Sequence, residues 1–585
     1  MTPAVYQPSL KRIDYLILLG YCTILFGISL VGGRPLSRHE AVLPQSSREM
    51  ALDHDWVVPK SGGRPWLESP PLPQWITVAV TSVVGHGSQV WPYRMAPAAM
   101  ATGVVLLAAW MASGWRGRGI GLVSGLAMAT LSEFTRYAWL AEDEIFLCFL
   151  VAACTAAFVR LEFFGGLPAE DQPYRFLGSR PRGVLLFFIL LGATNLAKGL
   201  LFGMALTMVT IIGYWVMNRD WRAVRPYIWC WGWLATLAVA AAWPAAAIHR
   251  FPDVTNVWFY DQMGRVSGNY TEINQPVWYY LKYLPEEIAP WTLIALVGLA
   301  LTAKAAFGRK RSPERFLWCW AWLPLAALSV PSGKHHHYLL HSLVPWSVLT
   351  AVALAWVRDQ VGSWPAWLRN PGWSLPLLGV PGAVAITLAG GRWHWQAWSI
   401  LLLTTGWVVL CWLFSYGLWH RLPQVATCTL FAVVAAAYCG GHVYAGKHAD
   451  RYRFDTAFLK QAKKCVPVDQ PLLINAGMGQ LEAFHTLFYL DDRSMSLHNL
   501  TFLLDARIHG EEVYLVTYGS DLAELAQYGT ARTVLESPHT WRNGCEGDPL
   551  TLFHLKYHPH TVRQAANVRI TPMQAMSYDR GPYLR

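Results

Sequence analysis

Long apolar stretches recur along most of this 585-residue chain, and they restrict its possible folds more than any other feature. A stretch of about 17 or more apolar residues can cross a bilayer as a helix, which satisfies its own backbone hydrogen bonds there. Only 14% of the residues are charged, whereas soluble domains contain about 25%. The sequence therefore predicts an α-helical, multi-pass membrane protein. Thirteen spans are predicted, at 13–31, 93–113, 119–138, 145–163, 183–197, 200–217, 227–248, 286–306, 315–331, 338–356, 374–390, 397–418 and 423–445.

Lysine and arginine are distributed unevenly among the loops between these spans. Every second loop is the more basic, and basic loops remain on the cytoplasmic side of a membrane. This pattern places the N-terminus in the cytoplasm and the loops 32–92, 249–285 and 332–337 outside it. The net charge of +11 follows from this arrangement, so nucleic-acid binding is not expected. Within the first outer loop, residues 72–84 are too few to span and are predicted to form a helix in the membrane interface.

The composition changes after residue 445. Residues 446–585 contain no span-length apolar stretch, and short helix and strand patterns alternate in them. We therefore expect a transmembrane domain over 1–445 and a small extracytoplasmic α/β domain over 446–585. Cys465 and Cys545 lie in the second domain, where an oxidising compartment would permit a disulfide between them. The predicted helices are 455–464, 479–490 and 521–528, and the predicted strands are 471–475 and 512–517.

Ionisable residues gather at the outer ends of the predicted spans, where they are costly and tend to mark function. A structural role is an alternative to a functional one for two of these groups. The acidic residues 142–144 can cap the helix at 145–163, and Lys198 can extend its ammonium to the membrane surface. Binding of one metal ion by three adjacent histidines is disfavoured, because neighbouring residues do not all face one ion. The groups are Arg38-His39-Glu40, Glu142-Asp143-Glu144, Lys198, and Ser332-Gly-Lys-His-His-His-Tyr338.

Carboxylates and cations at one membrane face suit the transfer of a sugar from a lipid-linked phosphate. The cations would stabilise the departing phosphate, and a carboxylate or histidine would accept the proton of the acceptor. The lipid tail would meanwhile remain in the bilayer.

A series of short motifs resembles those of the membrane glycosyltransferases related to aminoarabinose transferase and the protein mannosyltransferases. The resemblance covers residues 13–357, and it implies the GT-C fold and a polyprenyl-phosphate sugar donor. The motifs, in order, are Arg48-Glu-Met50, Asp55-Trp-Val-Val-Pro59, Glu68-Ser-Pro-Pro-Leu72, Asp143, Leu196-Ala-Lys-Gly199, Ala289-Pro-Trp291, Ser332-Gly-Lys334, Tyr338 and Pro345.

The resemblance also implies roles for single residues. His39, Glu40 and Asp143 would lie around the proton and the acceptor, and Glu68 would orient the first loop or bind a divalent metal. The family has an aspartate where this chain has His39, so the identity of the base is open: His39 and Asp143 are candidates, and Glu40 is a further one. Gln262 stands where a metal-binding histidine is expected, which argues against a divalent metal site. A divalent metal is still possible, and no cofactor is certain. The residues implied around the donor phosphate are Lys198, Arg265, Lys334 and Tyr338.

The predicted function is therefore sugar transfer from a polyprenyl phosphate to a lipid, glycan or protein acceptor. It would take place at the extracytoplasmic face of the inner, or plasma, membrane, and lipid A is one possible acceptor. One alternative is a non-catalytic relative that binds lipid-linked sugars, which the substitution at His39 motivates. A transporter or flippase is less favoured, because the chain has no internal repeat and its polar groups lie at one face.

Overall fold

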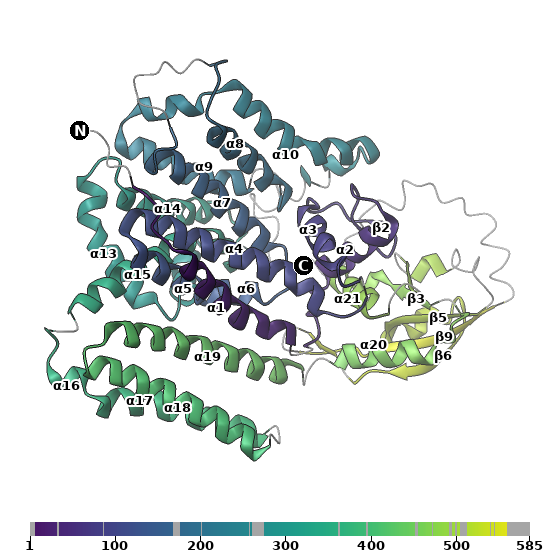
Figure 1. Cartoon of the computed structure of the whole chain (residues 1–585). Coiled ribbons are helices and arrows are strands. Elements are labelled where there is room, and N and C mark those ends of the chain that lie inside the picture. Colours follow the sequence, from purple (N-terminus) through teal and green to yellow (C-terminus); the bar gives the residue numbers. More distant parts are fainter. Residues whose placement is uncertain are drawn as a thin grey trace.

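A computed structural model of the chain shows a body of packed helices with a β-sheet at one end (Figure 1). In that view α17, α18 and α19 run along one side of the body, and the sheet lies beyond α2, α3 and α21. The residues that the structure describes are 6–31, 34–85, 87–167, 176–199, 202–256, 258–259, 274–360, 363–392, 396–450, 454–470, 472–490, 494–497, 500–503, 512–538, 540–542 and 545–558.

A helix occupies each of the thirteen predicted stretches. In the described part of the chain, seven helices are long and apolar enough to cross a membrane alone, and up to nine spans result if two bent pairs count as one each. The multi-pass helical fold is confirmed, whereas the count of thirteen spans stays a prediction. The helices are α1 (Arg12–Val31), α4 (Trp91–Arg116), α5 (Arg118–Ala129), α7 (Glu144–Phe163), α8 (Arg182–Ala193), α9 (Phe202–Asn218), α10 (Cys230–Arg250), α13 (Thr292–Gly308), α14 (Pro313–Ser329), α15 (Val344–Gln360), α17 (Pro371–Arg392), α18 (Ala397–Trp419) and α19 (Pro423–Asp450).

Several spans break into shorter pieces at one end of the body. The predicted span 119–138 divides into α5 and α6 (Ser132–Ala138), and α8 continues as the 3₁₀ helix η1 (Thr194–Leu196) just before Lys198. The short helix α12 (Tyr279–Glu287) meets α13 at 108°, and η4 (His336–Ser342) meets α15 at 63°. Irregular backbone at membrane depth is tolerated where protein surrounds it or where it lines a cavity. These breaks bring polar side chains together at the ends of the helices.

The loop 32–92, which was predicted to lie outside the cytoplasm and is called the first outer loop, is folded rather than extended. It contains α2 (Val42–Asp53), the strands β1 (Lys60–Ser61) and β2 (Arg64–Pro65), and α3 (Leu72–Thr81). The helix predicted at 72–84 is thus present but ends at Thr81, and its place in the membrane interface stays a prediction. The carboxylate of Glu49 accepts hydrogen bonds from the amides of Gly62 (2.6 Å) and Gly63 (2.9 Å). Both glycines have positive φ angles, 59° and 77°, which the turn between β1 and β2 requires.

The C-terminal region is a small α/β unit, as predicted. The helices α20 (Phe454–Cys465) and α21 (Gln480–Leu490) accompany a five-stranded sheet of order β4-β3-β5-β9-β6. The predicted strands are β3 (Leu472–Asn475) and β5 (Glu512–Tyr518), whereas the predicted helix 521–528 is reduced to α23 (Leu522–Leu525). The sequence did not predict β4 (Ser494–Leu497), β6 (Gly529–Glu536) or β9 (Leu550–Tyr557). Cys465 is free and exposed, which overturns its predicted disulfide with Cys545.

The α/β unit packs tightly onto the first outer loop. Buried Arg48 of α2 donates to the carbonyls of Leu487 and Phe488, each at 3.0 Å, at the end of α21. The ring of Trp66 packs edge-on against Phe484 at 5.6 Å. Arg38 pairs with Asp455 and Glu482, both at 3.2 Å. Because both parts contribute to one buried cluster, the division into two domains at residue 445 stays a prediction.

Candidate functional site

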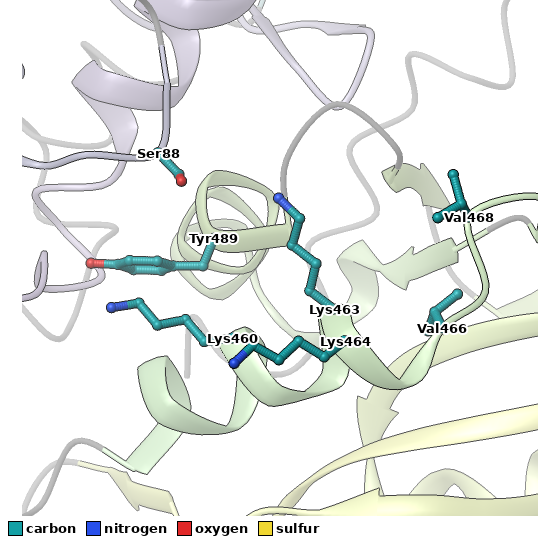
Figure 2. A pocket seen from close by; sticks show the side chains of 7 residues that line it. All are labelled: Ser88, Lys460, Lys463, Lys464, Val466, Val468 and Tyr489. Carbon is teal, nitrogen blue, oxygen red and sulfur yellow. The ribbon is translucent and has the colours of Figure 1, made fainter.

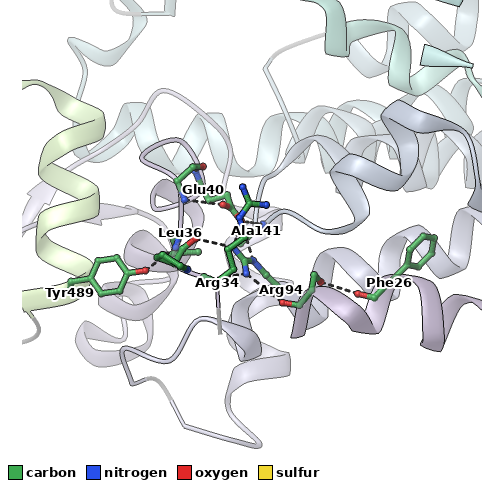
Figure 3. Close-up of polar contacts among 10 residues, drawn as sticks. Phe26, Arg34, Leu36, Glu40, Arg94, Ala141 and Tyr489 are labelled. Atoms are coloured by element: carbon green, nitrogen blue, oxygen red, sulfur yellow. Dashed lines mark hydrogen bonds and ion pairs between the residues drawn. The ribbon is translucent and has the colours of Figure 1, made fainter. Parts of the chain in front are cut away.

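A buried ion pair fixes the loop that follows α1. Glu40 is fully buried, and its Oε1 accepts from Arg94 Nη2 (2.9 Å), Arg94 Nε (3.1 Å) and the amide of Ala141 (3.2 Å). Its Oε2 accepts from the amide of Ser37 at 2.9 Å. Arg94 also donates to the carbonyls of Ser29, Arg34 and Pro35 (Figure 3). Glu40 therefore joins the ends of α1 and α4 to the segment before α7.

The protonation of Glu40 follows from these contacts. Burial raises the pKa of this carboxyl, but the charge of Arg94 and the hydrogen bonds from Ser37, Arg94 and Ala141 outweigh burial and lower it. Glu40 is therefore ionised at neutral pH. Its oxygens are occupied, so it is poorly placed to take a proton from a substrate.

His39 lies beside Glu40 in sequence but in a different environment, because its side chain is exposed. The protein around the ring lowers the pKa of His39, the nearby charge of Asp143 raises it, and that of Lys198 lowers it again. The net result is a lowered pKa, so the imidazole is neutral at pH 7. A neutral imidazole close to a carboxylate can accept a proton.

Two half-buried carboxyls precede α7 on the same side. Asp143 is the residue before the first turn of α7, where its charge also favours the helix N-terminus. Burial, together with the charges of Glu40 and Asp143, raises the pKa of Glu142 to about 8, although the charges of Arg136 and Lys198 oppose this shift. Glu142 is therefore largely neutral at pH 7.

The third carboxylate of this run, Glu144, holds the lysine that was predicted to bind phosphate. Glu144 is buried in the first turn of α7, and its Oε1 forms an ion pair with Lys198. His337 Nε2 lies 3.1 Å from the same oxygen, and His341 Nε2 lies 3.8 Å from Oε2. The ammonium of Lys198 also lies 5.5 Å from the ring centre of Tyr338. Glu144 thus joins α7, the end of η1 and η4 in one polar cluster.

The remaining predicted residues lie in varied places. Lys334 is buried, and its ammonium donates to the carbonyls of Gln275 (2.9 Å) and Pro331, while burial lowers its pKa. Glu68 is exposed in the first loop. Arg265 and Gln262 lie outside the described residues.

A second polar cluster lies next to the first, where α6, α12 and η4 pack together. Glu133 accepts from Arg136 Nη2 at 2.7 Å and pairs with His336 Nδ1 at 2.9 Å. Glu287 is buried nearby, and both of its carboxylate oxygens lack a hydrogen-bond partner among the described residues. The histidine run is thus divided: His336 contacts one cluster and His337 the other.

A metal site does not emerge from this geometry. Across the described ranges, no group of three or more His, Cys, Asp or Glu side chains has the arrangement that would hold a metal ion. The side chains around Glu144 are already engaged with a lysine, whose charge opposes a cation there. The described residues therefore do not fit the divalent metal that the resemblance made possible.

Sequence reasoning missed three residues of this arrangement. Glu144 was seen as part of the acidic run, but Asp143 was preferred within it. Arg94 was overlooked, although a lone arginine at the start of an apolar span is a signal in itself. His337 was set aside with its neighbours because a metal was the only role considered for them.

Curated relatives of this chain include several proteins called undecaprenyl phosphate-alpha-4-amino-4-deoxy-L-arabinose arabinosyl transferase. The protein of that name from Pseudomonas aeruginosa (strain LESB58) is 27% identical over 438 residues, which are 72% of this chain and 75% of the relative. The one from Aeromonas salmonicida (strain A449) is 28% identical over 428 residues, 70% of this chain and 74% of the relative. No family model matches the sequence.

A solved structure shares the fold almost end to end. The crystal structure of ArnT from Cupriavidus metallidurans bound to undecaprenyl phosphate superposes with a TM-score of 0.67, covering 92% of this chain and 97% of that chain at 19% identity. The apo structure of the same protein gives the same values. The GT-C-type fold expected from the motifs is thus confirmed, as is the resemblance to the aminoarabinose transferases.

Proposed function

We propose that this relative of the aminoarabinose transferases is a membrane glycosyltransferase, which moves a sugar from a polyprenyl-phosphate donor to an acceptor. One observation carries the proposal. The Lys198 cation, paired with Glu144, lies close enough to His39 for its charge to affect the histidine, together with that of Asp143. An anion-binding group and a proton acceptor are thus neighbours at the ends of apolar helices, as the transfer requires.

The donor phosphate would bind beside Lys198. Glu144 and Tyr338 position the ammonium on two sides, one through an ion pair and the other through its ring face. As the bond between the anomeric carbon and the phosphate oxygen breaks, negative charge builds up on the phosphate, and a fixed cation there lowers the barrier. Arg265 is proposed as a second phosphate ligand on the basis of the resemblance alone.

The acceptor would be activated by His39. An acceptor hydroxyl attacks the anomeric carbon, its proton passes to the neutral imidazole, and polyprenyl phosphate leaves on the opposite side with inversion. The nearby Asp143 carboxylate stabilises the imidazolium that forms. Asp143 is the alternative base, and it would act alone if His39 serves only to orient the acceptor.

Three other predicted residues would hold parts of the site in place. Glu40 is proposed to position His39, because its oxygens are committed to Arg94 and backbone amides. Lys334, predicted to bind the donor phosphate, instead holds the segment before η4 through backbone carbonyls; it would reach phosphate only after releasing them. Glu68 would orient the first loop.

The finer assignments rest on the relatives. Their name specifies a 4-amino-4-deoxy-L-arabinose carried on undecaprenyl phosphate, which makes this pentose the first donor to try. A lipid, including lipid A, a glycan or a protein remains a candidate acceptor. We place the reaction at the extracytoplasmic face of the inner membrane, where the loop charges put the polar clusters.

The test is transfer by purified protein in nanodiscs, supplied with radiolabelled polyprenyl-phosphate pentoses or hexoses and crude membrane acceptors. Wild-type protein should label an acceptor, and Lys198→Met should lower the rate by about 100-fold or more. His39→Ala should do the same if His39 is the base. His249→Ala, at an exposed histidine near the end of α10, is the matched control and should retain activity.

The same experiment separates the alternatives. Donor binding without labelling by any acceptor would support the non-catalytic relative that the substitution at His39 suggests. Labelling that survives His39→Ala but not Asp143→Ala would move the base to Asp143. Full activity in Lys198→Met would refute the proposed phosphate site.

A further inference from the structure

A hollow of about 580 Å³ lies between α20 and the loop that joins α3 to α4. Figure 2 shows three lysine side chains extending from α20 and its end, with Ser88 of the loop on the other side. The residues that line it are Ser88, Lys460, Lys463, Lys464, Val466, Val468 and Tyr489.

The hollow carries concentrated positive charge. Lys460, Lys463 and Lys464 are three and four residues apart, so they share one face of α20 and repel one another. Within the described residues, neither Lys460 nor Lys464 forms an ion pair with a carboxylate, although Lys460 lies 5.8 Å from the ring centre of Tyr489. The helix dipole favours cations in the last turn. The dipole does not explain why Lys460 lies one turn earlier, or why a cavity lies beside the three lysines.

The hollow lies near the ends of two predicted spans. Ser88 is three residues before Trp91, the first residue of α4, and is therefore within about 10 Å of it. On the other side, the hydroxyl of Tyr489 accepts from the amide of Leu36, just beyond the end of α1. The headgroup layer extends about 5–8 Å beyond the hydrocarbon core on each side. Ends of two spans thus flank the lysines.

Exposed apolar side chains accompany the charge. Val468 in the lining is 83% exposed, whereas Val466 beside it is buried. Val83, in the same loop as Ser88 but outside the lining, is 87% exposed. Lysines beside unburied aliphatic groups suit a ligand with an anionic head and an apolar tail. A free inorganic anion would gain nothing from the valines.

We propose that this hollow binds the phosphate-bearing headgroup of an anionic membrane lipid. The lysines would neutralise the phosphate, Ser88 would donate to it, and the exposed Val468 would contact the start of the acyl chains. None of the residues that line this lipid site is proposed to take part in the transfer, so the site does not rest on transferase activity. Its occupancy would fix α20 against the loop before α4.

Native mass spectrometry of the purified full-length protein in a neutral maltoside detergent tests the proposal. The probes are dihexanoyl phosphatidic acid, dihexanoyl phosphatidylcholine and inorganic phosphate, each titrated separately. A lysine near an anionic surface contributes about fivefold in binding. We therefore expect Lys460→Gln/Lys463→Gln/Lys464→Gln to weaken binding of phosphatidic acid by at least about tenfold, while the corresponding triple arginine variant retains it.

The matched control removes the same number of charges elsewhere. Lys304, Arg309 and Lys310 are exposed at the end of α13 and just beyond it, and their triple glutamine variant should bind phosphatidic acid as the wild type does. Unchanged binding in the α20 variant would overturn the proposal. So would inorganic phosphate binding as tightly as phosphatidic acid, which would assign the hollow to a free anion. Thermal unfolding of each variant confirms that it is folded.

Discussion

Replacing Arg94 with methionine should destabilise the protein strongly, because it leaves the Glu40 carboxylate buried without its counter-charge. Glu40 is fully buried, and Arg94 donates to it through two nitrogens at 2.9 and 3.1 Å. Breaking a buried pair by removing one partner costs about 3–5 kcal/mol. Arg94→Met also removes donors from three carbonyls at the end of α1, so we expect the upper part of this range.

The cost should depend on pH in a defined direction. In the wild type, folding lowers the pKa of Glu40. The ionised carboxylate therefore stabilises the folded protein at a pH above the ordinary carboxyl pKa, and this stabilisation is lost as the pH falls through the pKa of Glu40 in the folded protein. In Arg94→Met the burial of Glu40 is no longer opposed by the arginine, so its pKa rises. Protonation then relieves the penalty, and the deficit relative to wild type should shrink between pH 7 and about 5.

Equilibrium unfolding in mixed detergent and SDS micelles at several pH values measures these differences. Glu40→Met/Arg94→Met should recover most of the lost stability, since an apolar pair replaces the ion pair. Lys60→Met is the control, because the Lys60–Asp53 pair is partly exposed and is expected to contribute below about 1 kcal/mol. A cost for Arg94→Met as small as that of the control, or one that grows as the pH falls, would refute the assigned role of the pair.

Three further outcomes are expected. Because the pKa of Glu142 is raised to about 8, the wild type should lose stability and transfer rate as the pH rises through 8. Glu142→Gln should remove this alkaline decline from the pH–rate profile. An unchanged profile would exclude Glu142 as the source of the decline. Glu144→Gln should lower kcat by about 100-fold with a smaller change in KM, because Lys198 loses its orientation; an effect on KM alone would contradict this. Arg48→Met removes two hydrogen bonds to the end of α21, worth about 1.5–3 kcal/mol each. Limited proteolysis should therefore cleave the α/β unit of this variant faster than that of the control variant Arg532→Met, which changes an exposed residue. Equal cleavage rates would show that the contact is dispensable.

The helical body was predictable from sequence because a bilayer requires long apolar stretches, and α7 and α18 match their predicted bounds to within one residue. The breaks were not predictable, since they depend on distant contacts. The hydroxyl of Thr130, between α5 and α6, accepts from the indole of Trp291 at 2.9 Å, 161 residues away. In the α/β unit, β6 is largely exposed and lacks regular alternation, so it gave no strand pattern.

The site was predicted in outline, and its missing details have a geometric origin. Three adjacent carboxylates precede the span at 145–163, and the sequence cannot show which of them faces a cation. Since α7 begins at Glu144 and each helical residue turns by about 100°, the position of the first turn decides the matter. The position of this first turn directs Glu144 to Lys198, 54 residues away, and leaves Asp143 near His39.

The contrast between His39 and Glu40 explains how this chain can depart from its relatives' motif without losing the fold, and it gives a decisive substitution. The exposed His39 side chain supports no described element, whereas Glu40 holds three of them together. His39→Asp should therefore fold with unchanged stability. An aspartate ionises near pH 3.9, well below histidine, so the acidic limb of the pH–rate profile should move to lower pH if residue 39 is the base. The limb is measured by labelled transfer between pH 4 and 8. A limb that stays in place in His39→Asp would assign the base to Asp143, with residue 39 serving only to orient the acceptor.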